Sequence, residues 1–223
     1  IALPHNGGEL ELYTNDNLDV GLDRSLERLQ TDHIDIYLLH GHPREEPEIR
    51  RVIEHMATLK DRIHHFGISI GVPAGDAGKV YSDMWRTLYG EYPFLNSIMI
   101  TVNFENETAV NHVLPWTREL DTGVIAKTML GVGRLTNRFI DEWAKDDDSE
   151  GTVRLRKVRD LLVAKGVAGT LQEAALRYAL TRAETGAVAT VNTTHVDEAI
   201  RNMLEGPLPE DVLDEIRVIF AGE

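Results

Sequence analysis

The sequence contains no cysteine among its 223 residues. Disulfide bonds, thiolate metal sites and a cysteine nucleophile are therefore excluded, and a reducing compartment, the cytoplasm, is the expected location. The chain also lacks an apolar run near the ~20 residues that span a bilayer. Its first ten residues have neither the basic start nor the apolar centre of a signal peptide. We expect a soluble protein with no membrane partner.

Basic residues are scarce as well. Lysines and arginines number 23 against 37 aspartates and glutamates, which gives a formal net charge of -14. The negative electrostatic field of this charge repels the phosphate backbone of a nucleic acid unless a local basic patch overcomes it. The richest patch lies at Arg154, Arg156, Lys157 and Arg159, beside the acidic run Asp146–Asp148, and this mixture is typical of a solvated helix face. We predict a small-molecule partner and no nucleic acid.

What the sequence does have is a set of short apolar runs rich in β-branched residues. With 42% hydrophobic residues, the length suits a single domain over residues 1–223. Each run predicts a buried strand. The predicted strands are Ile34–His40, Ile63–Ile70, Ser97–Asn103, Gly123–Met129 and Ala187–Thr193.

Segments with helical spacing of apolar residues separate these runs. Leu18 to Leu29 and Ile49 to Leu59 show it first, and further helices are predicted at Thr108–Leu120, Gly151–Lys165, Thr170–Arg182, Thr194–Leu204 and Pro209–Phe220. Asn15–Asn17 offers cap oxygens for one helix, and Thr170 with Glu173 has capping-box spacing. Alternating strands and helices predict a parallel sheet, either doubly wound or closed into a barrel.

The stretch Leu22–His42, LDRSLERLQTDHIDIYLLHGH, resembles the aldo-keto reductases. In that family a helix carrying SLxRL leads through a Thr-Asp turn into a strand that ends in histidine. Later features follow in family order: IHHFGIS, VNF, TGVIAKTMLGVGRLT, LQEAALRYAL and EAIRNM. The resemblance implies an α/β fold, a (β/α)8 TIM barrel. This chain would supply about the last six βα units, with the N-terminal strands missing.

The same resemblance implies a function. Aldo-keto reductases transfer hydride from NADPH or NADH to the carbonyl of an aldehyde or ketone, at the C-terminal mouth of the barrel. Of the Tyr, Lys, Asp and His that assist proton transfer in the family, only the His has a counterpart here, His40. The other three belong to the first three units, and Tyr13 lies in the wrong unit to replace the tyrosine.

Cofactor contacts are implied at several positions, and others depart from the family pattern. Ser69 matches the serine that contacts the nicotinamide amide. Ile70, Met99 and Lys127 stand where the family has Asn, Gln and the Tyr that stacks on the nicotinamide. The remaining predicted cofactor contacts are Asn103, Thr128 and Leu130, with Thr193 and Thr194 at a helix N-terminus, where a phosphate binds favourably.

His40 and Lys127 are the candidate catalytic residues. Histidine titrates near neutral pH, and a lysine inside a barrel strand is desolvated, so its amine is suited to act as a base or to form a Schiff base. Two alternatives stay open for these residues. Lys127 merely snorkels if it faces the helices. Independently, His40 is a leftover family residue if a neighbouring hydrogen bond satisfies it. Non-redox lyase or isomerase chemistry with Lys127 and His40, or a non-catalytic scaffold, therefore remain alternative functions.

A metal site is not predicted. His40 and His42 share one face of an extended segment, but no third ligand is evident. His64 and His65 alternate between the two faces of their strand, and no carboxylate has ligand spacing nearby. Asp35, at the N-terminal end of its strand, is interpreted as organising the Thr31–Asp32 turn.

Six strands of eight leave two parallel sheet edges unpaired, because only closure removes the edges of a barrel. We expect these edges to be completed by an N-terminal segment, by a separate chain or by a second copy in a homo-oligomer.

Overall fold

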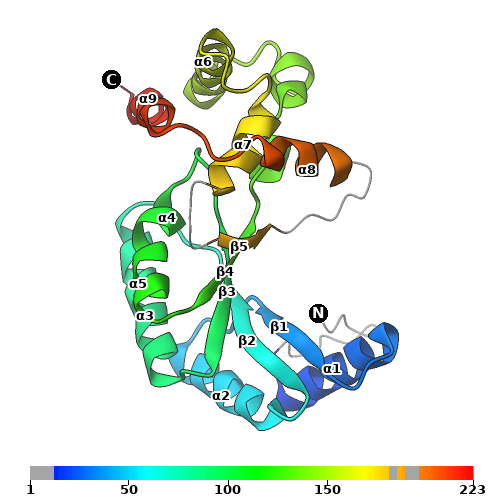
Figure 1. The fold of residues 1–223 in the computed structure, drawn as a ribbon. Coiled ribbons are helices and arrows are strands. Elements are labelled where there is room, and N and C mark those ends of the chain that lie inside the picture. Colours follow the sequence, from blue (N-terminus) through cyan, green and yellow to red (C-terminus); the bar gives the residue numbers. More distant parts are fainter. Residues whose placement is uncertain (1–12, 181–184, 189–195, 223) are drawn as a thin grey trace.

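The computed structural model describes residues 13–180, 185–188 and 196–222. Within them, five parallel strands form one sheet whose order follows the sequence. They are β1 (Ile34–His40), β2 (Ile63–Ser69), β3 (Leu95–Thr101), β4 (Gly123–Lys127) and β5 (Thr185–Val188). A doubly wound sheet reverses its strand order, whereas a barrel wall does not. The predicted partial barrel is confirmed, and Figure 1 shows its open, curved wall.

Helices follow the strands as the alternation predicted. Their bounds are α1 (Asn15–Leu29), α2 (Glu46–Met56), α3 (Asp76–Glu91), α4 (Thr108–His112), α5 (Leu114–Glu119), α6 (Glu150–Ala164), α7 (Leu171–Leu180), α8 (Val196–Leu204) and α9 (Glu210–Ala221). Helices α2, α3 and α5 line the outer side of the sheet, and α6 to α9 gather beyond β5 (Figure 1). None of the described helices is long and apolar enough to cross a membrane.

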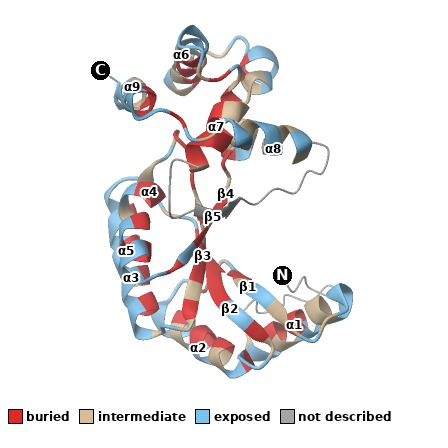
Figure 2. Cartoon of the chain, viewed as in Figure 1, coloured by how far each residue is buried: buried red, intermediate tan, exposed pale blue. Residues whose placement is uncertain are grey.

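The two faces of the sheet differ sharply in burial. Side chains that face the helices are almost fully buried: Phe66, Ile68, Ile98, Ile100, Val124 and Ala126. On the opposite, concave face His65 is exposed and Ile36 is 48% exposed. The core therefore lies between the sheet and the helices, where the buried segments gather (Figure 2).

The structure has two helices where the sequence predicted one. The helix expected over Thr108–Leu120 breaks at Val113, so that α4 and α5 are separate. Pro115 explains the break, because a proline has no backbone N–H and its ring clashes with the carbonyl of the fourth residue before it.

Helix caps also differ in detail from the predictions. Thr14, not the Asn15–Asn17 run, caps α1, since its hydroxyl accepts from the Asn17 N–H at 3.2 Å. Before α7 the Thr170 hydroxyl accepts from the Glu173 N–H at 3.2 Å. The Glu173 carboxylate reaches Gly169 rather than Thr170, and accepts its N–H at 2.9 Å. Both helix starts are thus satisfied by side-chain oxygens.

Candidate active site

Three of the predicted site residues meet at the C-terminal ends of the strands. His40, Ser69 and Met99 are neighbours in register across β1, β2 and β3, so they share the concave face. Lys127 ends β4 and pairs with Thr101, two residues further along β3 than Met99. Since barrels place their chemistry at this end, the concave face around these residues is the candidate active site.

Lys127 points onto the concave face and not toward the helices. Its Nζ donates a hydrogen bond to Ser69 Oγ at 2.8 Å, across the intervening strand β3. Burial lowers the pKa of the Lys127 amine. The side chain therefore does not snorkel outward, and it places a partly desolvated positive charge beside the serine predicted to bind the nicotinamide amide.

His40 is the exposed residue of this group. Its backbone carbonyl accepts from the Tyr13 hydroxyl at 3.5 Å, and its imidazole makes no hydrogen bond within the described residues. Burial raises the pKa of Tyr13, which keeps the phenol protonated. Sequence reasoning set Tyr13 aside because it lies in the wrong unit, yet the structure places its hydroxyl at the mouth.

Asn103 holds the loop after β4. Its Nδ2 donates to the Thr128 carbonyl at 3.0 Å, and its Oδ1 accepts from the Asn106 N–H at 2.9 Å. Thr128 has φ of 55°, a left-handed conformation that a β-branched residue rarely adopts. Backbone strain of this kind is kept where surrounding contacts fix it, and it clusters at functional sites. Whether Asn103 and Thr128 also contact a cofactor stays a prediction.

The remaining predicted cofactor contacts divide into two groups. Leu130 is half-buried in the same loop and packs against the main core. Thr193 and Thr194 lie outside the described residues, so the predicted phosphate contact stays a prediction.

His42 does not join His40. Its Nδ1 contacts the Pro43 carbonyl at 2.5 Å, its Nε2 contacts the Tyr81 hydroxyl at 2.5 Å, and its ring packs edge-on against Trp85 of α3. The predicted shared face was wrong because Gly41, with φ of 78°, turns the chain after β1.

The sequence analysis predicted no metal site at His64 because no carboxylate had ligand spacing nearby, and this reason is wrong. A carboxylate does lie near His64: Asp35 Oδ1 on the neighbouring strand is 3.9 Å from His64 Nδ1. Asp35 does not organise the turn before β1. There the Thr31 hydroxyl accepts from the His33 N–H at 3.5 Å.

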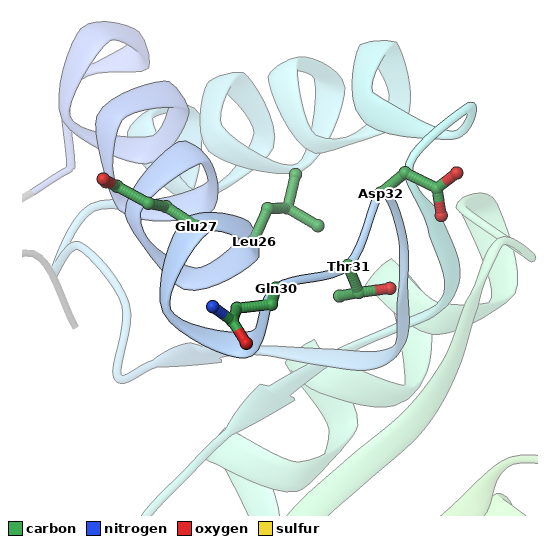
Figure 3. A pocket seen from close by; sticks show the side chains of 5 residues that line it. All are labelled: Leu26, Glu27, Gln30, Thr31 and Asp32. Carbon is green, nitrogen blue, oxygen red and sulfur yellow. The ribbon is translucent and has the colours of Figure 1, made fainter.

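One hollow of the described surface lies away from the mouth. A shallow cavity of about 610 Å³ is lined by Leu26, Glu27, Gln30, Thr31 and Asp32 (Figure 3). It sits where α1 turns into β1, at the opposite end of that strand from His40. Barrels place their chemistry at the other, C-terminal end of the strands, so the cavity is not a candidate active site.

Comparison with known proteins decides the family. The sequence profile of the aldo/keto reductase family matches residues 5–220. The chain belongs to the aldo/keto reductase family. A search of curated protein sequences returns no match.

Solved structures agree on the fold. The chain is similar to a glycerol dehydrogenase from Gluconobacter oxydans, with a TM-score of 0.72 and 17% identity, over 98% of this chain and 69% of that one. It is also similar to an aldo-keto reductase from Bacillus halodurans in its holo form, with a TM-score of 0.66 and 24% identity, over 92% and 65%. This aldo/keto reductase chain thus spans about two thirds of the structures it matches.

The mouth retains part of the donor set that a nicotinamide cofactor requires. The Ser69 hydroxyl accepts from Lys127 Nζ at 2.8 Å, so its own O–H can donate to the carbonyl oxygen of a carboxamide. Ile70 is fully buried and Met99 carries no strong donor, so neither supplies the amide contact that its family counterpart makes. The residues present therefore fit the carboxamide through the Ser69 hydroxyl, which Lys127 holds in place.

Proposed function

We propose that this chain forms the larger part of an NAD(P)H-dependent reductase that acts on the carbonyl of an aldehyde or ketone in the cytoplasm. The observation that carries the proposal is the convergence of His40, Ser69 and Lys127 from three strands, with Lys127 Nζ bonded to Ser69 Oγ at 2.8 Å. Membership of the aldo/keto reductase family supports the reaction class.

When bound, the reduced nicotinamide would supply hydride to the carbonyl carbon of the substrate. Ser69 would hold the carboxamide by its hydroxyl. His40, exposed at the mouth, would donate a hydrogen bond that orients the substrate carbonyl oxygen. As negative charge develops on that oxygen, the Lys127 ammonium would stabilise it and give up a proton to it, which a lysine of lowered pKa does more readily.

The test is consumption of NADPH and NADH by the whole protein with a panel of aldehydes and ketones. Lys127→Met, which keeps the length of the side chain and removes its charge, is expected to lower kcat/KM by about 100-fold or more. Lys79→Met is the matched control, because Lys79 is exposed on α3 and, among the residues that the structure describes, pairs with Asp83. An equal loss in both variants would sink the proposed role of Lys127.

A second candidate function also uses the amine of Lys127. The lowered pKa of Lys127 also suits a Schiff base in a lyase or isomerase that needs no nicotinamide. Borohydride treatment in the presence of a carbonyl substrate would then attach the substrate covalently to Lys127 and not to the Lys127→Met variant. No turnover of either kind would leave a non-catalytic scaffold as the function.

A further inference from the structure

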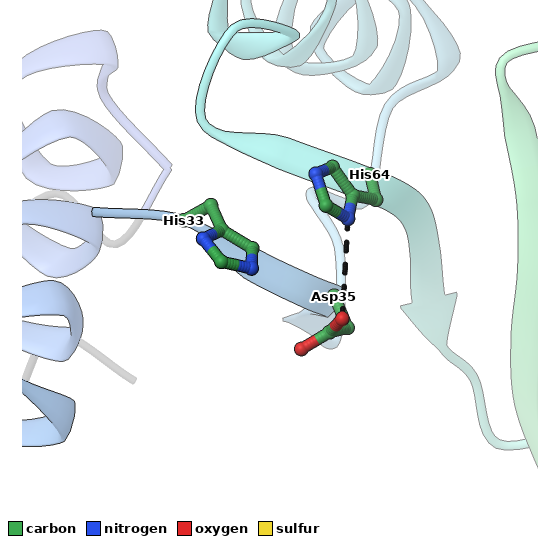
Figure 4. Close-up of side chains that lie close together, drawn as sticks. All are labelled: His33, Asp35 and His64. Carbon is green, nitrogen blue, oxygen red and sulfur yellow. Dashed lines mark ion pairs between the residues drawn. The ribbon is translucent and has the colours of Figure 1, made fainter. Parts of the chain in front are cut away.

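Two histidines and an aspartate face one another at the N-terminal ends of β1 and β2, opposite the mouth. His33 precedes β1, Asp35 is its second residue, and His64 is the second residue of β2. Ile34 pairs with Ile63 and Ile36 pairs with His65, so Asp35 and His64 lie side by side between these pairs. His33 and Asp35 are two residues apart in an extended segment and share one side. Figure 4 shows the three side chains together.

The distances suit a metal ion after a small adjustment. One ring nitrogen of each histidine and one oxygen of Asp35 all lie within 4.8 Å of one another. The two imidazole rings stack with centroids 4.9 Å apart. Tetrahedral bonds of about 2.1 Å bring ligand atoms to roughly 3.4 Å from one another. The side chains of His33, His64 and Asp35 are 44%, 58% and 85% exposed, which leaves them free to close by roughly this difference.

A fourth residue orients the first histidine. Asp32 Oδ1 lies 2.8 Å from His33 Nδ1, so this nitrogen carries the proton that the carboxylate accepts. Nε2 of His33 is then the nitrogen with a free lone pair. A carboxylate that holds the other nitrogen of a ligand histidine is the usual outer partner in metal sites. The hydrogen bond has a second consequence here, because it fixes the ring of an otherwise exposed side chain.

We propose that His33, Asp35 and His64 bind a divalent transition metal of the zinc class, with Asp32 as a positioning residue. Two imidazoles and one carboxylate match zinc and its neighbours, whereas magnesium and calcium prefer oxygen ligands alone. Three protein ligands leave one coordination position for water. The site lies far along the strands from His40 and Lys127, so it does not depend on the proposed reductase function.

Such a metal would add coordinate bonds to the side-chain contacts and backbone hydrogen bonds that already join the N-terminal ends of β1 and β2. β1 is an edge strand of the described sheet, and metal bonds to both β1 and β2 would hold its N-terminal end in register. Because a ligand that binds only the folded state raises stability by mass action, zinc is expected to raise the melting temperature of the protein.

Calorimetric titration of the whole, tag-free protein with Zn²⁺ near neutral pH tests the site. The expected result is one zinc per chain, loss of that binding in His64→Gln and Asp35→Asn, and about tenfold weaker binding in Asp32→Asn. Co²⁺ in place of zinc should give the visible absorption of a tetrahedral site, and Mg²⁺ should give no heat.

His65→Gln is the matched control. His65 is the next residue of the same strand and is also exposed, but its side chain lies on the concave face. The proposal requires full zinc binding in this variant, with circular dichroism unchanged in all of them. Absence of one-to-one binding, or equal weakening in His64→Gln and His65→Gln, would overturn it.

Discussion

For the side chains at the mouth, the sequence predicts which way a residue points but not which residue it contacts. Lys127 was expected to face inward because it aligns with an inward-facing aromatic of the family, and its bond to Ser69 shows that it does. The partner could not be predicted, because it lies two strands away and depends on the register of both pairings. For the same reason the contact between Asp35 and His64 was missed, since neither lies near the other in sequence.

The state of Lys127 predicts how activity depends on pH. Burial lowers its pKa below that of an ordinary lysine, about 10.4, so it loses its proton as pH rises through a lower range. If the protonated amine assists the reduction, kcat/KM falls across that range. In Lys127→Arg the guanidinium stays charged, and the alkaline fall should disappear or move upward. An identical alkaline limb in both proteins would assign the titration to another group.

Strands and helices were predicted about equally well: the helix predicted over Pro209–Phe220 is α9, Glu210–Ala221, whereas of the strand predicted over Ala187–Thr193 only Ala187 and Val188 lie within the described residues. The strand over Ile34–His40 has the predicted bounds, because a short apolar run between a turn and a glycine leaves little choice. The helix over Thr108–Leu120 was wrong, since apolar spacing continued through Pro115 and the effect of the proline was not weighed. Apolar periodicity thus locates an element more reliably than it sets the ends of that element.

Because β2 and β3 lie in close contact at Gly67, we expect substitution of this glycine to destabilise the fold. A Cβ at Gly67 would lie 2.1 Å from the Ser97 carbonyl oxygen and 2.5 Å from Ser97 Oγ, and the pairing shifts register beside it. Gly67→Ala is expected to lower the free energy of unfolding by about 3 kcal/mol, as measured by urea denaturation.

Gly123→Ala provides the comparison in β4. A Cβ at Gly123 meets its nearest atom, the Asn96 carbonyl oxygen, at 3.5 Å, which is ordinary contact. Gly123→Ala should therefore lower the free energy of unfolding by no more than a surface substitution does, about 0.5 kcal/mol or less. Equal losses for the two glycines would show that β2 and β3 are not packed as closely as described.

At the scale of the whole molecule, the fold class was predicted from resemblance and not from periodicity, which left the doubly wound sheet open. Strand order then excluded that alternative. Within the described residues, Ile36 on the concave face is 48% exposed, and β1 offers an unpaired edge of the described sheet. We propose that a completing N-terminal segment or a second copy covers this face, because exposed apolar sheet edges associate.

Residues 1–223 produced alone should therefore associate. Light scattering coupled to size exclusion is expected to give a mass above the 25.0 kDa of one chain. A stable monomer of 25.0 kDa would contradict this expectation.

The central claim is that the mouth around Ser69 and Lys127 binds a reduced nicotinamide. Titration of the whole protein with NADPH and NADH tests it most directly, followed by nicotinamide fluorescence and by quenching of Trp85, Trp116 and Trp143. We expect saturable binding that weakens in Ser69→Ala and in Lys127→Met, and that is unchanged in Lys79→Met. Saturable binding that is equally strong in Ser69→Ala and Lys127→Met, or no binding at all, would contradict binding of the nicotinamide at the mouth.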